Sequence, residues 1–142
     1  MSSDLKNLYQ ELILQHNKQP VCFYEMEDAD LVLEAYNPIC GDRFKVFVKM
    51  EADQVSEISF KGYGCAISKA STSVMMEQFI GKTKSELEGI IEEFYQAIEG
   101  TDASNSREAF QAFAKVKDFP GRKQCVVLAW VEWKHHLENP PS

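Results

Sequence analysis

Three cysteines stand where a strand or a helix is expected to begin or end, and a carboxylate lies beside the first of them. They are Cys40, Cys65 and Cys125, and Asp42 follows Cys40 by two residues. Thiolates and a carboxylate are ligands that a tetrahedral zinc ion accepts, and a free thiolate is also a nucleophile. The four side chains are therefore candidates for one metal site, for thiol chemistry, or for both.

The local settings of Cys65 and Cys125 favour the ionised form, and that of Cys40 lets it face the same side as Asp42. Cys65 is expected at the N-terminus of one helix and Cys125 in the first turn of another, where unpaired N–H groups and the helix dipole favour a thiolate. Cys40 lies in a turn between two expected strands, where residues two apart, such as Cys40 and Asp42, can face the same side. Three sulfur ligands and one oxygen hold an ion less firmly than four sulfurs would. One ligand could therefore leave, which suits a site that carries out a reaction.

The spacing of these residues is not a zinc-finger pattern. The sequence contains no Cys-x-x-Cys pair, and long intervals separate the three cysteines. Free cysteines inside cells are often small buried hydrophobic residues with no chemical role. On spacing alone, a metal site and ordinary packing both stay open.

Length and composition restrict the classes of function. The chain has 142 residues, 44% of them hydrophobic, enough for one domain with a substantial core. A formal net charge of -7 leaves no electrostatic footprint for nucleic acid or an anionic membrane. No run is long and apolar enough to span a bilayer, and the N-terminus lacks the features of a signal peptide. We therefore expect a cytoplasmic protein whose thiols stay reduced.

Hydrophobic periodicity predicts an α+β fold. The expected elements, in chain order, are an amphipathic helix ending near residue 16 and before Pro20, strands over 31–36, 44–50 and 57–61, and helices over 65–79, 84–99, 109–116 and 122–137. Thr83 and Glu86 fit a capping box at the start of one helix. Strands precede most of the helices, so we expect a small antiparallel three-stranded sheet with helices packed on one face.

The residues around the cysteines form three motifs that resemble the NifU-N/IscU-like family of iron–sulfur assembly proteins. The motifs are Asn37-Pro38-x-Cys40-Gly41-Asp42, Gly62-x-Gly64-Cys65-Ala66-Ile67-Ser68 and Cys125-x-x-Leu128-Ala129-Trp130. Their order matches the family, and the resemblance runs from about Leu5 to Trp133. It implies one domain over 1–142 with the SufE/NifU-like fold.

Within that family the chain is more similar to the SufU branch than to the IscU branch. The Leu-Pro-Pro-Val-Lys segment that a chaperone reads in IscU proteins is missing, and Gln124 stands where they carry a histidine before the last cysteine. The interval from Cys65 to Cys125 is longer, as a SufU-type insertion over about 100–117 would make it. Arg122 also matches the SufU pattern, and residues 138–142 are expected to be a loose tail.

The resemblance implies a zinc-dependent sulfur acceptor. Zinc would be bound by Cys40, Asp42, Cys65 and Cys125, and the partner would be a SufS-type cysteine desulfurase that carries sulfur as a persulfide. Cys40 is the predicted acceptor, because a turn is more mobile than a helix start and a released ligand is a nucleophilic thiolate. Arg122 would orient the partner or the anionic persulfide. A downstream cluster-assembly complex is a further expected partner.

Two other functions are consistent with the same residues. A [2Fe–2S] cluster could be assembled on these cysteines and passed to apo-proteins, since thiolates also hold such clusters. The missing histidine and the missing chaperone segment count against this scaffold role. A purely structural zinc domain is the second alternative, although structural sites prefer four Cys or His ligands.

The remaining cysteine and the histidines belong to no motif. Cys22 is interpreted as a core or surface thiol. His16, His135 and His136 are placed near helix ends, where a cation suits the dipole.

Overall fold

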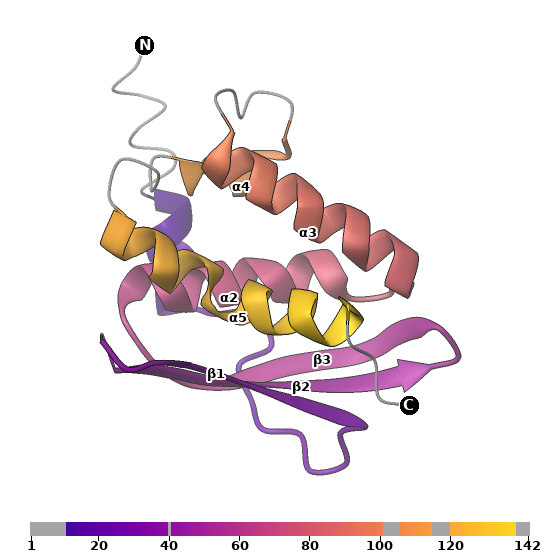
Figure 1. Ribbon diagram of the computed structural model, residues 1–142. Helices are drawn as coiled ribbons and strands as arrows, with labels where there is room; N and C mark the ends of the chain where they lie inside the picture. The colour runs from indigo at the N-terminus through magenta and orange to yellow at the C-terminus, as the bar shows by residue number, and fades with distance from the viewer. Residues whose placement is uncertain (1–10, 40, 101–105, 115–119, 139–142) are drawn as a thin grey trace.

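The computed structural model describes residues 11–39, 41–100, 106–114 and 120–138 (Figure 1). Its strands are β1 (Leu31–Asn37), β2 (Asp42–Glu51) and β3 (Gln54–Tyr63). They form one antiparallel sheet in the order β1-β2-β3. The three strands predicted from the sequence are therefore confirmed, and the second and third are longer than expected because their ends carry polar residues that break the alternation.

The alternation of side chains along β2 decides which face of the sheet is covered. Phe44, Val46 and Val48 are buried, whereas Arg43 before Phe44 and Lys45 after it are exposed. Successive side chains in a strand point to opposite faces, so the buried set lies on the side that carries the helices. The sheet thus has one packed face and one face that is exposed near the ends of β1 and β3.

Four labelled helices lie on one side of the sheet (Figure 1). They are α2 (Ala66–Phe79), α3 (Lys84–Glu99), α4 (Glu108–Gln111) and α5 (Pro120–Glu138). α2 and α5 contact the strands directly, and α3 packs against α5. This arrangement confirms the expected α+β fold with helices on one face.

Some predicted helix limits were wrong by a few residues. Residues 11–18 are helical, so the first helix continues two residues past His16 and ends before Pro20. α5 begins at Pro120 rather than at residue 122, because proline suits the first turn of a helix. α4 is shorter than the expected 109–116 helix, and 115–119 lie outside the described residues. So do residues 101–105 and 115–117 of the predicted insertion and the tail from 139 on.

The aromatic core joins three helices. The Trp130 ring of α5 stacks on Phe94 of α3 with centroids 3.9 Å apart, and its edge meets Phe79 of α2. Trp130 Nε1–H also donates to Ser71 Oγ at 2.9 Å, and Ser71 in turn donates to the Val126 carbonyl at 2.6 Å. These contacts fix α5 against α2, and α5 carries Cys125.

The start of α3 is defined by the predicted capping box. Thr83 Oγ1 accepts the Glu86 N–H, and the Glu86 carboxylate accepts the Thr83 N–H. A bridge between Gln54 and Thr83 places this helix start beside the β2–β3 turn. Among the helices of the described segments, none has the length and apolar character needed to cross a membrane.

Candidate metal centre

Three of the four nominated side chains meet at one place. One ligand atom each from Asp42, Cys65 and Cys125 lies within 4.8 Å of the other two. Asp42 begins β2, Cys65 immediately precedes α2, and Cys125 lies in the first turns of α5. Asp42 and Cys125 are buried at 1% and 3% exposure, while Cys65 is partly exposed. The group is therefore open to solvent on the Cys65 side.

Asp42 is oriented by the backbone at the start of α2. Its Oδ1 accepts the Cys65 N–H at 2.8 Å, and its Oδ2 lies 4.0 Å from Cys65 Sγ. One oxygen of the carboxylate is thus occupied by a hydrogen bond, and the other faces a sulfur. A buried carboxylate held in this way can serve as a one-oxygen ligand at low cost in entropy.

The chain packs closely where it leaves β3 for α2. A Cβ added to Gly64 would lie 2.8 Å from Asp42 Oδ1, 2.7 Å from Ser68 Oγ and 2.9 Å from Phe44 Cε2. Ser68 is itself buried and donates to the Cys65 carbonyl at 3.0 Å. The glycine therefore lets the backbone that carries Cys65 approach the carboxylate of Asp42.

Asn37 connects Cys125 to the turn between β1 and β2. Its Nδ2 lies 3.9 Å from Cys125 Sγ, and its Oδ1 accepts the Ile39 N–H at 3.2 Å. Its carbonyl accepts the Gly41 N–H at 2.8 Å, and the residue is 6% exposed. Asn37 belongs to the first cysteine motif, and no role was predicted for it, although an asparagine before a proline-containing turn is a known turn signal.

The fourth nominated ligand, Cys40, lies outside the described residues, so its place at the centre stays a prediction. Its covalent neighbours Ile39 and Gly41 are described, and they belong to the turn that joins Asn37 to Asp42. Asn37 and Asp42 are paired in the sheet, and both contact cysteines of the group.

Arg122 is exposed in the first turn of α5, three residues before Cys125. It is therefore on the surface, on the same helix end as a member of the group. Its predicted role toward a partner or a persulfide is not decided by this position.

The donor set fits zinc. Zinc bonds of about 2.0–2.3 Å in a tetrahedron place ligand atoms about 3.3–3.8 Å apart. The described atoms lie within 4.8 Å of one another, so small side-chain rotations bring them to that spacing. Two sulfurs and one carboxylate oxygen leave a fourth position for another ligand, as borderline-soft zinc requires.

The other cysteine is not part of this group among the described residues. Cys22 has a positive φ of 54° and is partly buried against the core. Burial, and then the nearby Glu57 carboxylate, raises the pKa of the Cys22 thiol above its ordinary value of 9.0. This thiol is therefore poorly suited to act as a nucleophile, which agrees with its interpretation as a packing residue.

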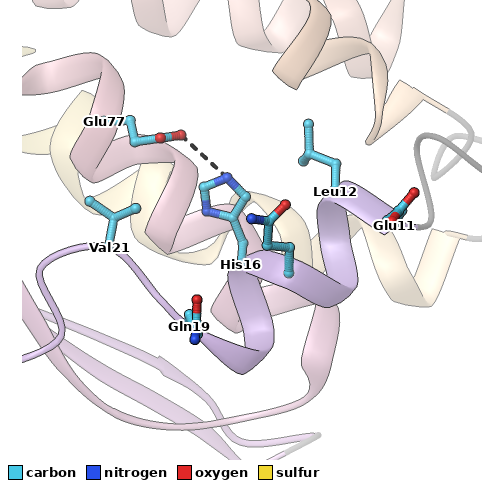
Figure 2. A pocket seen from close by; sticks show the side chains of 7 residues that line it. Glu11, Leu12, His16, Gln19, Val21 and Glu77 are labelled. Atoms are coloured by element: carbon cyan, nitrogen blue, oxygen red, sulfur yellow. Dashed lines mark ion pairs between the residues drawn. The ribbon is translucent and has the colours of Figure 1, made fainter.

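His16 lines a separate pocket beside the helical segment 11–18. The sequence predicted a place near a helix end for this histidine, but no tertiary contact. Figure 2 shows His16 pointing toward Glu77 of α2, with Nε2 3.3 Å from Oε1. Its Nδ1 lies 2.7 Å from the Oγ of fully buried Ser73, which also accepts the Val21 N–H at 2.7 Å. His16 therefore attaches this segment to α2, while His135 and His136 lie in the last turn of α5 as predicted.

Comparison with known proteins places this centre in a family. The model of the NifU-like N terminal domain matches residues 8–126. A Streptococcus pyogenes protein named iron-sulfur cluster assembly scaffold protein IscU is 35% identical over 96% of this chain and 87% of its own length. A Bacillus subtilis protein named zinc-dependent sulfurtransferase SufU is 31% identical over 91% of this chain and 88% of its own length.

A solved structure of a related protein has a similar fold. The crystal structure of a putative iron-sulfur cluster assembly scaffold protein for the SUF system, from Fervidobacterium islandicum AW-1, superposes with a TM-score of 0.82 at 34% identity. The match covers 89% of this chain and 94% of that one. The chain therefore belongs to the NifU-like N-terminal domain family of iron–sulfur cluster assembly proteins.

Proposed function

We propose that this protein is a zinc-dependent sulfur acceptor that takes persulfide sulfur from a SufS-type cysteine desulfurase. The observation that supports it most is the group of Asp42, Cys65 and Cys125, of which Asp42 and Cys125 are buried and whose mixed sulfur and oxygen donors suit zinc. The similarity to a protein named zinc-dependent sulfurtransferase supports the same reading. Cys40, in the turn between Asn37 and Asp42, would be the fourth ligand.

Zinc, when bound, supplies a positive charge that keeps the cysteine sulfurs ionised, and it has no redox chemistry of its own. The protein residues then have separate tasks. Asp42 is held by the Cys65 N–H, so its free oxygen stays directed at the centre. Asn37 contacts Cys125 and accepts the Ile39 N–H, so it connects the turn after β1 to the helix that carries Cys125.

The transfer itself is a thiol–disulfide type of exchange. The Cys40 thiolate attacks the terminal sulfur of the donor's persulfide, and a new S–S bond forms at Cys40 Sγ. The donor's own S–S bond breaks, and its electron pair leaves with the donor cysteine as a thiolate. No oxidant or reductant is consumed, because one persulfide replaces another. Arg122 on the surface of α5 would steady the anionic group during the exchange.

A second candidate function is the assembly of a [2Fe–2S] cluster as cargo on the same cysteines. The naming of the 35% identical relative as a scaffold favours it. The donor set does not exclude it, because thiolates hold such clusters and a carboxylate can replace one of them. The two functions differ in what the purified protein contains and in its effect on a desulfurase.

The test combines metal content with desulfurase turnover. Protein purified without added metal should contain about one zinc per chain. It should increase the turnover of a SufS-type desulfurase, and Cys40→Ala should abolish that increase. Mass spectrometry after one round should find one added sulfur atom on the peptide that contains Cys40.

Cys22→Ala is the matched control, since this thiol lies outside the group, and it should stimulate as the wild type does. Full stimulation by Cys40→Ala would make another thiol the acceptor. Bound iron and sulfide with a visible chromophore, together with unchanged turnover, would establish the scaffold function instead.

A further inference from the structure

A row of exposed side chains crosses the sheet next to the metal centre. Tyr36, Arg43 and Tyr63 are directly paired across β1, β2 and β3. The two tyrosines are 52% and 64% exposed, and the Arg43 guanidinium lies 4.4 Å from the centre of the Tyr36 ring. We call these three residues the aromatic–cationic row.

The row borders the group of ligands. Tyr36 precedes Asn37, Arg43 follows Asp42, and Tyr63 lies two residues before Cys65. Because strand side chains alternate, Asn37 and Asp42 face the helices, while the row faces away from them. The row therefore occupies the solvent side of the same end of the sheet.

Exposed apolar area continues from the row onto the turn. Ile39, in the turn that leads to the second strand, is 83% exposed. Large exposed side chains scattered singly need no explanation, but Tyr36, Ile39 and Tyr63 all lie at the end of the sheet beside the candidate centre. Further along β2, Phe47 is 5% exposed, although Val32, its partner in β1, is 44% exposed.

The charge of this face is opposite to that of the whole chain. The next paired row contains Glu34, Lys45 and Lys61, and Glu34 and Lys45 lie 3.7 Å apart. With Arg43, the two rows carry three cations and one carboxylate, whereas the chain has a formal net charge of -7. A local basic surface on an acidic protein selects a partner surface of acidic character.

We propose that the aromatic–cationic row, together with Lys45 and Lys61 of the next paired row, is the docking surface for the protein that donates sulfur, through a carboxylate-rich segment beside the donor's persulfide. This proposal rests on the proposed function. Tyrosine and arginine are, with tryptophan, enriched among the residues that dominate binding energy, and the aromatic–cationic row contains only tyrosine and arginine. Docking here brings the donor to the end of the sheet where Asn37 and Asp42 flank the turn after β1.

The chemistry of the row favours a protein over a nucleic acid. Three cations are too few to offset the repulsion of an acidic chain toward a phosphate backbone, and phosphate binding needs no apolar side chains. Tyr36, Ile39 and Tyr63 instead offer apolar area that an acidic protein segment with apolar residues would cover.

The decisive experiment measures affinity and turnover separately. Binding of the wild type, Arg43→Glu and Lys61→Glu to a purified SufS-type desulfurase is measured by isothermal titration calorimetry at low and high salt. We expect each reversal to raise Kd by about tenfold at low salt and by less at high salt. Turnover at saturating concentrations of each variant should equal that of the wild type.

Lys84→Glu is the matched control. Lys84 is exposed at the start of α3, beside the β2–β3 turn at the opposite end of the sheet. Its reversal changes the net charge equally and should change Kd by less than about twofold. Zinc content and thermal unfolding are measured for every variant. If Arg43→Glu loses zinc, the Kd of Lys61→Glu, which is farther from the candidate ligands in the chain, is the value that tests the proposal.

The outcomes separate the two proposals. Equal Kd values for the wild type and both reversals would overturn the docking surface, whatever the turnover shows. Tight wild-type binding that the reversals weaken, with no stimulation of turnover, would support the docking surface and overturn sulfur acceptance. No binding by the wild type would overturn both.

Discussion

At the scale of single residues, the candidate centre depends on groups that are not themselves candidate ligands. Asn37 holds the turn through Ile39 and contacts Cys125, and the Cys65 N–H holds Asp42. In metal sites, residues of this kind orient the ligands, and their loss commonly weakens metal binding by about 10–100-fold. Gly64 also supports the candidate centre, because its lack of a side chain lets the backbone pass close to the Asp42 carboxylate.

Gly64→Ala should weaken zinc binding by about tenfold or more and destabilise the fold. The added methyl group would lie 2.8 Å from Asp42 Oδ1 and 2.9 Å from Phe44 Cε2, so the carboxylate must move. Competition with a chromophoric chelator measures the first effect, and urea unfolding measures the second.

Gly89→Ala is the matched control for this substitution. A Cβ at Gly89 meets nothing within 4 Å, and the residue lies inside α3. The change should leave zinc affinity unaltered and stabilise the protein by about 0.5–1 kcal/mol. If Gly64→Ala and Gly89→Ala bind zinc equally well, the close contact between the backbone at Gly64 and the Asp42 carboxylate does not position that carboxylate.

At the scale of elements, the short helix α4 is attached to α3 by the ring contact of Phe110 with Phe94 and by an ion pair. Arg107, which precedes α4, donates from Nε to Glu93 Oε2 at 2.7 Å and from Nη2 to Oε1 at 3.0 Å. Its backbone N–H also donates to Glu93 at 2.9 Å. Hydrogen bonds from Arg107, opposed in part by burial, lower the pKa of the Glu93 carboxyl below its ordinary value of 4.5.

Arg107→Ala should destabilise the protein by about 1 kcal/mol at neutral pH, a figure reduced for solvent screening because the pair is partly exposed. A carboxyl whose pKa is lowered by folding stabilises the protein above its unfolded pKa and loses that contribution as the pH falls through the folded pKa. The difference between wild type and variant should therefore be complete above pH 4.5 and shrink below it.

Urea unfolding from neutral to acidic pH measures this difference. Arg122→Ala, which removes an exposed arginine of α5, is the control and should cost less than about 0.5 kcal/mol at every pH. A destabilisation by Arg107→Ala that is constant from pH 7 to pH 3 would show that packing, rather than the ion pair, accounts for it.

At the scale of the whole molecule, the aromatic core connects α2 and α5, which position Cys65 and Cys125, to α3, which carries no residue of the candidate centre. Trp130 contacts Phe94 of α3 and Phe79 of α2, and it lies on the helix that carries Cys125. The relative positions of α2 and α5 decide how far Cys65 is from Cys125. Core packing and the geometry of the centre are therefore coupled.

Trp130→Ala should destabilise the protein by about 3–5 kcal/mol, since it removes a fully buried aromatic side chain and leaves a cavity. It also removes the Nε1–H donor to Ser71. Val131→Ala, one residue along and 45% exposed, should cost less than about 1 kcal/mol. Both values come from urea unfolding, and similar costs for the two variants would contradict the assignment of Trp130 to the core.

Local patterns accounted for much of the fold. The alternation in β2, the stripe of α3 and the capping box of Thr83 and Glu86 each involve residues close in the chain, so their physical basis is visible in a short segment. Helix limits were less accurate, as at His16 and Pro120, because the ends of helices depend on what packs beside them.

From the sequence alone one could name Asp42, Cys65 and Cys125 as candidate ligands, place them at element ends, and recognise the family motifs around them. The folded structure was needed to show that these three meet, that Asn37 contacts Cys125, that His16 attaches the segment 11–18 to Ser73, and that Tyr36, Arg43 and Tyr63 form one exposed row. The reason is that each of these contacts joins segments that are far apart in the chain. Their proximity is set by strand register and by helix packing in the common core, and neither is encoded in any short stretch of residues.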